Sequence, residues 1–240
     1  MNRVILSAST DETILAVTRQ HKLVDLEIEQ QINTEIVGCI YKGIVKNIVP
    51  AVDGIFVDIG IGKNAFLRRK DLLNEKRFPT EGSPILAQVI KSDTDMKGAL
   101  ITEKISMLGK YAVTLSGTGY IGVSKKIRSE SVRERLKETG KEICAEHMGL
   151  IIRTAAENAD MDEFRKDIIR LKENWDIIQK RFRMEKSPTL LYRESDIIVK
   201  ALRDYVNKGT EILITDNRKI YDRTVSYTHL RAHETLMNLV

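Results

Sequence analysis

The segment Tyr41–Leu67 constrains the fold of this chain most strongly. It contains two runs rich in Val and Ile, Tyr41–Val49 and Gly54–Ile59, separated by a proline-containing breaker, and a short third run, Ala65–Leu67. β-Branched residues interrupted by Gly and Pro are typical of short, closely spaced strands. Gly43 lies inside the first run, where the missing side chain predicts a bulge or a sharp coil.

Two further runs, Ile85–Lys91 and Ala99–Thr102, bring the number of strand-like segments to five. Five short, curved strands are the content of an OB-fold barrel, which binds single-stranded nucleic acid on its face. Phe56 and Phe66 are the only Phe residues in these runs. The basic residues that surround them in sequence are Lys42, Lys46, Lys63, Arg68, Arg69 and Lys97. Aromatic side chains stack on bases and basic side chains bind phosphates, so the pattern favours single-stranded RNA; the alternative is that both rings belong to the core of a small barrel.

The composition permits a nucleic-acid partner without requiring one. The 240 residues are 42% hydrophobic and 30% charged, which is enough for one or two globular cores. The net charge is +5 with a pI of about 9.1, so the chain is mildly basic. No apolar run approaches the length of a membrane span, and the N-terminal residues contain no apolar run typical of a signal peptide, so we expect neither. Cys39 and Cys144 have no zinc-site spacing, so we expect reduced thiols in a cytoplasmic protein.

Three strand-like runs precede the barrel, Arg3–Ala8, Thr13–Val17 and Leu23–Glu29. The turns between them are short and polar, which predicts an antiparallel meander. In the third run apolar and acidic residues alternate, as in a half-buried strand. Its buried face would hold Val24, Leu26 and Ile28, and its solvated face Asp25, Glu27 and Glu29.

Strands and helices alternate after the barrel. We expect strands at Ile105–Leu115, Tyr120–Ser124 and Gly149–Thr154, and a helix that starts with the capping-box spacing Ser131–Glu134 and stops at Gly140. The clearest helix has a stripe at steps of three and four that is typical of a core face. This stripe consists of Phe164, Ile168, Leu171, Trp175, Ile178 and Phe182.

The end of the chain holds two more predicted elements. A helix is expected over Asp196–Asn207, with Gly209 as its stop, and a last strand over Glu211–Thr215. We expect this strand to return to the sheet of the N-terminal meander.

Several segments resemble the ribonuclease E/G family. They read YKG-x-V-x-x-I-x-P, FVDIG, NAFL, MKGALIT, ISMLGKYAV, GVSKKI, HMGLIIRTAAE and PTLLYRESD, and extend from Val4 to about Asp216. The resemblance implies an α+β multidomain fold, in which an RNase H-like subdomain is split by an inserted five-stranded OB-fold barrel of the S1 type and an α/β five-prime-sensor subdomain. The expected boundaries are 1–35 and 196–225 for the RNase H-like parts, 36–104 for the OB domain and 105–195 for the sensor. The short connection Arg68–Ser83 favours the ribonuclease G branch.

The resemblance also implies a function and its residues. The family comprises single-strand-specific, magnesium-dependent endoribonucleases of RNA processing and decay. Its RNA-gripping residues match Phe56, Phe66 and Lys97. Its pocket for a five-prime monophosphate matches Gly109, Val113, Lys125, Arg153 and Thr154.

Two of these assignments, Arg153 and Lys97, have simpler alternatives. An Arg fork beside a hydroxyl suits a monophosphate, because both can donate to its oxygens. Lys125 stands where the family often has Arg, which weakens a bidentate contact there. Arg153 could instead end a strand and pair with Glu157, and Lys97 could be a solvated charge.

Catalytic and metal-binding residues are expected outside this chain. In the family, two Asp side chains of a later subdomain hold a Mg²⁺ ion that activates water, and a later Cys pair shares a Zn²⁺ ion between subunits of a homo-oligomer. Asp58 and Asp216 are not expected to replace that site, because nothing places them as a convergent pair, and Asp58 is expected to cap a turn.

The tail Ser226–Thr235 reads SYTHLRAHET and has no periodicity. It resembles a translated sequencing-adapter read-through, so we expect residues 226–240 to be non-native, with the natural protein continuing from about Val225. The alternative is a metal site at His229 and His233 with Glu234 beside it.

Three functional hypotheses follow. The first is the N-terminal RNA-binding and five-prime-end-sensing part of an endoribonuclease. The second is a non-catalytic RNA-binding OB-fold module, and the third is a structural domain whose basic charge is solubilising. An isolated OB domain would not explain the LIIRTAAE segment or the long helix around Trp175, so the first is favoured.

Overall fold

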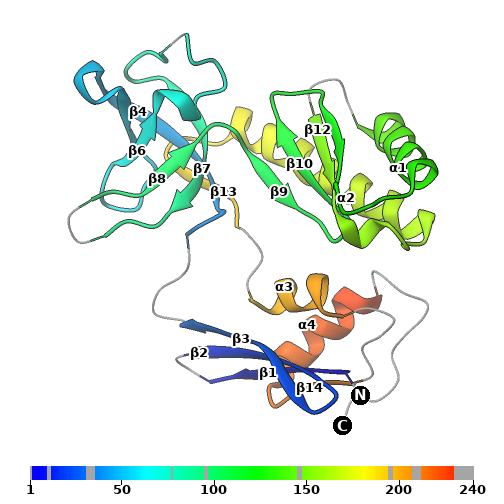
Figure 1. Ribbon diagram of the computed structural model, residues 1–240. Coiled ribbons are helices and arrows are strands. Elements are labelled where there is room, and N and C mark those ends of the chain that lie inside the picture. Colours follow the sequence, from blue (N-terminus) through cyan, green and yellow to red (C-terminus); the bar gives the residue numbers. More distant parts are fainter. Residues whose placement is uncertain are drawn as a thin grey trace. The chain divides into compact units, whose positions relative to one another are not determined.

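The computed structural model of the chain describes residues 2–9, 12–30, 36–76, 78–94, 97–144, 148–193, 197–206 and 212–229 (Figure 1). The chain divides into two compact units. One combines Met1–Glu35 with Ser195–Val240, and the other is Ile36–Glu194. Within the described residues, no helix combines the length and the apolar character that a membrane span requires.

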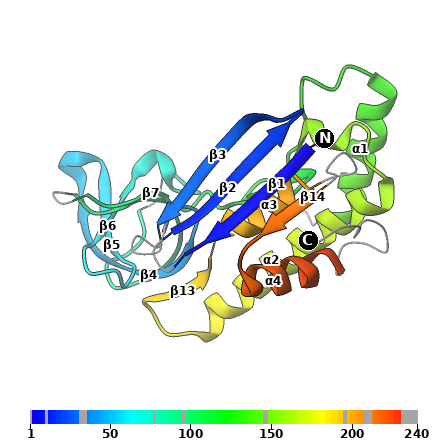
Figure 2. The same ribbon diagram turned by 90° about the horizontal axis from the view of Figure 1, so that it is seen from below.

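The first unit contains a four-stranded sheet. Its strands are β1 (Asn2–Ala8), β2 (Glu12–Arg19), β3 (Lys22–Gln30) and β14 (Ile212–Thr215). They lie side by side in the order β14-β1-β2-β3 (Figure 2). As predicted, β1 to β3 form an antiparallel meander, and the late strand β14 returns to it, pairing in parallel with β1.

Two helices, α3 (Ile197–Asp204) and α4 (Arg218–His229), cover one face of this sheet (Figures 1 and 2). The helix predicted over 196–207 therefore exists, although both of its expected ends and the stop at Gly209 lie outside the described residues. The core between sheet and helices consists of Val4, Leu6, Leu15, Val17, Ile197, Ile198, Ala201, Leu202 and Ile220.

The exposure of the two faces of β3 is the reverse of the prediction. Its apolar side chains, expected in the core, are 52–55% exposed: Val24, Leu26 and Ile28. Its acidic side chains, expected in solvent, are half-buried: Asp25, Glu27 and Glu29. Glu27 forms an ion pair with Lys200 of α3 at 2.7 Å, and the Tyr205 hydroxyl donates to Asp25. Alternation identified the two faces correctly, but the polar partners that decide which face is covered come from residues far along the chain.

The second unit begins with a closed barrel of five strands, as predicted. They are β4 (Ile40–Val49), β5 (Gly54–Asp58), β6 (Ala65–Arg68), β7 (Pro84–Lys91) and β8 (Leu100–Thr102). β4 pairs with β5, β5 with β6, β6 with β8, β8 with β7, and β7 with β4 again. Alternate side chains fill the inside, among them Val45, Ile55 and Leu67.

The curvature of β4 has two sources. At Gly43 a Cβ atom would lie 2.5 Å from Cγ1 of Val57, so the close approach of β5 requires glycine. The bulge predicted at Gly43 lies later, where the register between β4 and β5 shifts between Val45 and Asn47. Of the two alternatives predicted at Gly43, a bulge or a sharp coil, the bulge is therefore not at that residue.

The rest of the second unit is an α/β layer. Its sheet holds β9 (Ser106–Leu108), β10 (Ala112–Ser116), β11 (Ile121–Val123) and β12 (Met148–Ile152) in the order β11-β12-β10-β9. Two helices, α1 (Glu130–Ile143) and α2 (Met161–Met184), cover one face of it. β13 (Thr189–Tyr192) then pairs with the first residues of the barrel strand β4, which joins the two parts.

Two predictions in this layer need correction. The strand expected over 105–115 is divided by a turn at Gly109, where the backbone N–H of Gly109 donates to the carbonyl of Ala112 at 2.8 Å. Helix α1 starts after Ser129, whose side chain makes no cap hydrogen bond, and continues past Gly140. Gly140 is buried inside the helix, where it lets Leu150 approach closely, so it is a packing residue and not a stop.

Helix α2 matches its prediction closely. The Asp160 side chain caps it by accepting from the N–H groups of Asp162 and Glu163. Its apolar stripe is core, since Phe164, Ile168, Leu171 and Ile178 are buried, and Trp175 and Phe182 pack against them.

Candidate nucleic-acid interface

Phe56 and Phe66 form a pair on the outer face of the barrel. They are opposite one another on β5 and β6, with ring centroids 5.4 Å apart and planes tilted by 49°. Both side chains are half-buried, whereas the alternate positions Ile55 and Leu67 point inward and are fully buried. The alternative that the two rings are core residues is therefore wrong.

The aromatic pair belongs to a row of neighbours that crosses four strands. Asn47 of β4 lies opposite Phe56, Phe66 lies opposite Phe56, and Leu100 of β8 lies beside Phe66. Asn47 is exposed and Leu100 half-buried. Sequence reasoning missed Asn47, because its place beside Phe56 depends on the bulge in β4. The row therefore combines two rings, an aliphatic side chain and an amide that can both donate and accept.

The ring of Phe66 rests on Gly54. A Cβ atom at position 54 would overlap Cε2 and Cζ of the Phe66 ring. Since Gly54 is the diagonal neighbour of Phe66 on β5, the missing side chain leaves the ring room to lie along the strand surface.

Lys97 lies in the connection that precedes β8, which passes beside the start of β6. It ends a tight turn in which Thr94 and Lys97 exchange backbone hydrogen bonds at 2.8 and 3.2 Å. The following residue, Gly98, packs so closely on the carbonyl of Asn64 that no side chain fits there. Lys97 is exposed, and its ammonium has no hydrogen-bond or ion-pair partner among the residues that the structure describes.

Three other basic residues of the barrel, Lys42, Lys46 and Lys63, are bound to protein groups. Lys42 donates to the carbonyl of Glu185 at 2.6 Å and stacks over Phe182. Lys46 pairs with Asp58 at 3.3 Å. Lys63 donates to a turn carbonyl at 3.0 Å. Sequence proximity to the aromatic pair therefore does not show which charges are available to a ligand.

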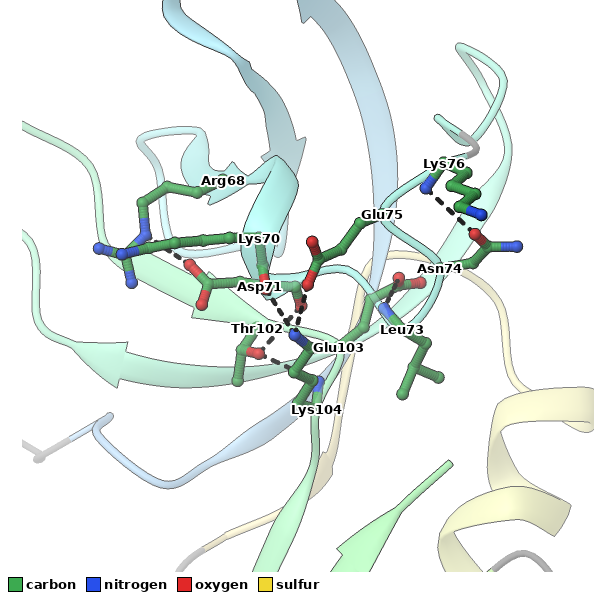
Figure 3. Close-up of polar contacts among 10 residues, drawn as sticks. All are labelled: Arg68, Lys70, Asp71, Leu73, Asn74, Glu75, Lys76, Thr102, Glu103 and Lys104. Atoms are coloured by element: carbon green, nitrogen blue, oxygen red, sulfur yellow. Dashed lines mark hydrogen bonds and ion pairs between the residues drawn. The ribbon is translucent and has the colours of Figure 1, made fainter. Parts of the chain in front are cut away.

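The loop after β6 is fixed to the end of β8 by a polar cluster (Figure 3). The carbonyl of Asp71 accepts from the Thr102 hydroxyl at 3.0 Å and from the Glu103 N–H at 2.9 Å. Glu103 in turn accepts from the Leu73 N–H at 2.9 Å. Burial raises the pKa of the Glu103 carboxyl, and the Leu73 hydrogen bond lowers it in part.

The second set of predicted residues surrounds the turn between β9 and β10. The Arg153 guanidinium donates to the carbonyls of Gly109 at 2.7 Å and Lys110 at 3.2 Å. From the other side, the buried Asp167 accepts from the N–H groups of Lys110 at 3.2 Å and Tyr111 at 2.8 Å. Asp167 was not predicted, because nothing in the pattern of α2 distinguishes it from a surface carboxylate.

Thr154 and Lys125 lie at the parallel ends of β12 and β11. The hydroxyls of Thr154 and Ser124 are 2.9 Å apart, and Ser124 directly precedes the exposed Lys125. Val113 is half-buried on β10, opposite Ile151. The structure thus joins Gly109 to Arg153 and Thr154 to Ser124, and sequence reasoning missed the second hydroxyl.

The residues considered as metal ligands do not gather. Within the described ranges, no group of three or more His, Cys, Asp or Glu side chains could hold a metal ion. Asp58 accepts from the Gly60 N–H at 2.9 Å, so it caps a turn as predicted. Asp216 accepts from the Ser7 hydroxyl at 2.5 Å and from the Ala8 N–H, which lowers the pKa of its carboxyl. The tail site lies outside the described residues, as do His233, Glu234 and the side chain of His229.

Two family models match the chain. The S1 RNA binding domain matches residues 34–102, which include all five barrel strands. The Ribonuclease E/G family matches residues 106–239, more than half of the chain.

Curated relatives agree with these models. Ribonuclease G of Escherichia coli strain K12 is 32% identical over 242 residues, which cover 94% of this chain and 50% of that protein. Ribonuclease G of Haemophilus influenzae is 31% identical over 242 residues, with 94% and 49% covered. Ribonuclease E of Buchnera aphidicola subsp. Schizaphis graminum is 32% identical over 250 residues, with 97% and 25% covered. The chain thus spans about half the length of the ribonuclease G relatives, and it belongs to the ribonuclease E/G family.

Proposed function

We propose that this chain is the RNA-binding and five-prime-end-sensing part of a single-strand-specific endoribonuclease of RNA processing and decay. Family membership and the S1 match support this proposal. The observation that carries it is the half-exposed pair of Phe56 and Phe66 on the outer face of the barrel.

The barrel face suits unpaired bases. Each ring can stack on one base, and such stacking contributes about 1–3 kcal/mol per base. In a duplex both faces of a base are already stacked on neighbours, so the rings would favour single strands. Lys97 supplies a phosphate contact beside Phe66, and the Asn47 amide can hydrogen-bond to the edge of a base stacked on Phe56.

The turn at Gly109 suits a terminal phosphate. Arg153 is held there by two backbone carbonyls, which fixes its guanidinium before a ligand arrives. Thr154 and Ser124 add two adjacent hydroxyls, and Lys125 adds a charge. In this proposal Arg153, Thr154 and Lys125 bind the phosphate oxygens, while Gly109 and Val113 line the approach.

We assign subdomains accordingly. The sheet of β1, β2, β3 and β14 with its two helices would be a split RNase H-like subdomain, which the parallel return of β14 supports. Residues 105–195 would be the sensor subdomain, because they hold all five residues of the proposed phosphate pocket.

A magnesium site for RNA hydrolysis does not fit the described residues, because their carboxylates do not converge. A zinc site formed by the two cysteines does not fit either, because Cys39 lies in the barrel core and Cys144 packs against the separate core of the α/β layer. In this proposal, the role of this part of the protein is to bind and orient RNA.

Fluorescence anisotropy with labelled RNA tests the proposal. The protein should bind a single strand more tightly than a duplex of the same sequence, and should prefer a five-prime monophosphate over a five-prime hydroxyl. Equal affinity for single strand and duplex would exclude stacking as the binding mode. Equal affinity for the two end groups would exclude the sensor but leave the barrel site in place.

A further inference from the structure

Strand β6 is short, and a basic residue lies near each of its ends: Lys97, from the segment before β8, and Arg68. Asn64 immediately precedes it, with Lys97 brought beside Asn64 by the close packing of Gly98. Arg68 is its last residue and lies two positions after Phe66, so both side chains point to the same outer face. Four residues at about 3.3 Å each separate the two ends by roughly 13 Å.

The Arg68 side chain is held in place with its outer edge free to bind. Among the described residues its one partner is Asp71, which accepts from Nε and leaves the two Nη groups available. The Asp71 side chain is 15% exposed and that of Arg68 is 37% exposed, so the carboxylate is the more buried partner and holds the guanidinium in position. Arg68 therefore presents donors to solvent in a fixed orientation, which suits a bidentate phosphate contact.

The loop that carries Asp71 is itself fixed. Besides the two hydrogen bonds to the Asp71 carbonyl, Lys104 donates to the carbonyl of Lys70 at 2.6 Å and pairs with Glu75 at 3.1 Å (Figure 3). The backbone of Lys70 is anchored in this way, and its exposed side chain extends toward the same side as that of Arg68 (Figure 3). The Lys70 ammonium has no partner within the described part of the chain, so the loop carries a charge that Asp71 does not neutralise.

The neighbouring Arg69, in contrast, is bound to protein groups on two sides. Its guanidinium pairs with Asp53 and stacks on the Phe78 ring at 3.8 Å. Its side chain is 36% exposed, nearly the same as Arg68. The two adjacent arginines thus differ in their partners and not in their accessibility.

We propose that Arg68 and Lys70 form a second phosphate-binding site, at the opposite end of β6 from Lys97. The RNA backbone then follows β6 from Lys97 to Arg68, with a base stacked on Phe66 between the two phosphate contacts. This inference rests on the proposed RNA-binding function of the barrel. It adds a second phosphate contact to that site and defines the stretch of RNA backbone that the site binds.

The test compares Arg68→Gln, Lys70→Gln and the matched control Arg69→Gln by anisotropy with a single-stranded RNA over a salt series. Each variant removes one positive charge. Loss of one phosphate contact should reduce the slope of log K against log salt by about 0.7. If the variant and the wild type bind equally at 1 M salt, this difference in slope makes the affinity of the variant about fivefold lower at 0.1 M salt. We expect this change for Arg68→Gln and Lys70→Gln, and an unchanged slope for Arg69→Gln.

The outcomes distinguish a failure of the second phosphate site from a failure of the barrel proposal. Equal slopes for all three variants and the wild type overturn the second phosphate site, provided that Phe66→Ala still weakens binding. If Phe66→Ala binds as the wild type does, the barrel proposal itself fails. Should Arg68→Gln lose its folded circular-dichroism signal, Lys70→Gln decides, because its side chain has no structural partner among the described residues.

Discussion

The Phe66 ring lies on the backbone of Gly54, at a distance that leaves no space for a Cβ atom. A glycine on one strand therefore sets the orientation of a ring on the next. The same ring faces Phe56 and lies between the two ends of β6, so its orientation governs the whole proposed RNA surface.

Gly54→Ala should weaken binding to single-stranded RNA although residue 54 touches no RNA itself. The new methyl group displaces the Phe66 ring, and the loss should approach the stacking energy of one base, about 1–3 kcal/mol. A double-mutant cycle measures it by anisotropy. In the Phe66→Ala background, Gly54→Ala should have no further effect; an additional loss of the same size there would show that the glycine acts in another way.

The sensor proposal makes a prediction about two adjacent lysines. Lys125 follows the hydroxyl pair of Ser124 and Thr154, whereas Lys126 is the next exposed residue along the chain. Lys125→Gln should reduce the preference for a five-prime monophosphate over a hydroxyl end, and Lys126→Gln should not. Arg153→Ala should abolish the preference while internal single strands still bind. Affinities of the three variants for RNA with each end group provide the measurement, and equal effects of the two lysine variants would argue against a defined pocket.

Glu103→Gln should stabilise the protein at neutral pH. Burial raises the pKa of Glu103 in the folded state above its ordinary value of 4.5. Protonated Glu103 therefore favours folding, and this contribution is fully present below pH 4.5 and is lost as the pH rises through the folded-state pKa. Gln stays neutral and can still accept from the Leu73 N–H.

Urea unfolding from pH 4 to pH 7 checks this prediction. The free energies of unfolding of wild type and Glu103→Gln should converge at pH 4, with the variant more stable at pH 7. Glu75→Gln, at an exposed partner of Lys104, is the control and should show no such divergence. A constant difference between Glu103→Gln and wild type across the range would mean that titration of Glu103 is not its source.

This chain should not cleave RNA. Hydrolysis by a metal-bound water needs convergent oxygen ligands, and the described residues offer no such group. Incubation with labelled, five-prime monophosphorylated single-stranded RNA and Mg²⁺ should yield no products. Metal-dependent cleavage that persists after residues 226–240 are removed would contradict the prediction, and Asp25, Glu27 and Glu29 would then be the first residues to substitute.

The elements of the fold were predictable where a single repeating pattern decides them. The stripe from Phe164 to Phe182 could only be one face of a helix, and the five runs around Phe56 matched a barrel. β3 was predicted as a strand but with its faces reversed, because alternation does not reveal that Lys200 and Tyr205 would cover the acidic side.

The candidate sites show the same limit. Phe56 and Phe66 could be identified from their position in the strand runs and from the family resemblance. Asn47 depends on the register shift in β4, and Arg68 differs from Arg69 only through tertiary partners. Such residues can be identified only when the backbone path is known. Arg68 and Arg69, for example, are adjacent and carry the same charge, so the sequence does not distinguish them.

Phe66→Ala compared with Phe78→Ala is the most direct test of the central claim that the outer face of the barrel binds single-stranded RNA. Both rings are half-buried, but Phe78 lies in the connection between β6 and β7, packs against the barrel core and stacks with Arg69, outside the row of Asn47, Phe56, Phe66 and Leu100. Anisotropy with one labelled single strand at one salt concentration gives both affinities, and thermal unfolding confirms that both variants fold. We predict that Phe66→Ala weakens binding by about 1–3 kcal/mol and that Phe78→Ala binds as wild type does. Equal affinities for the two folded variants would contradict the account.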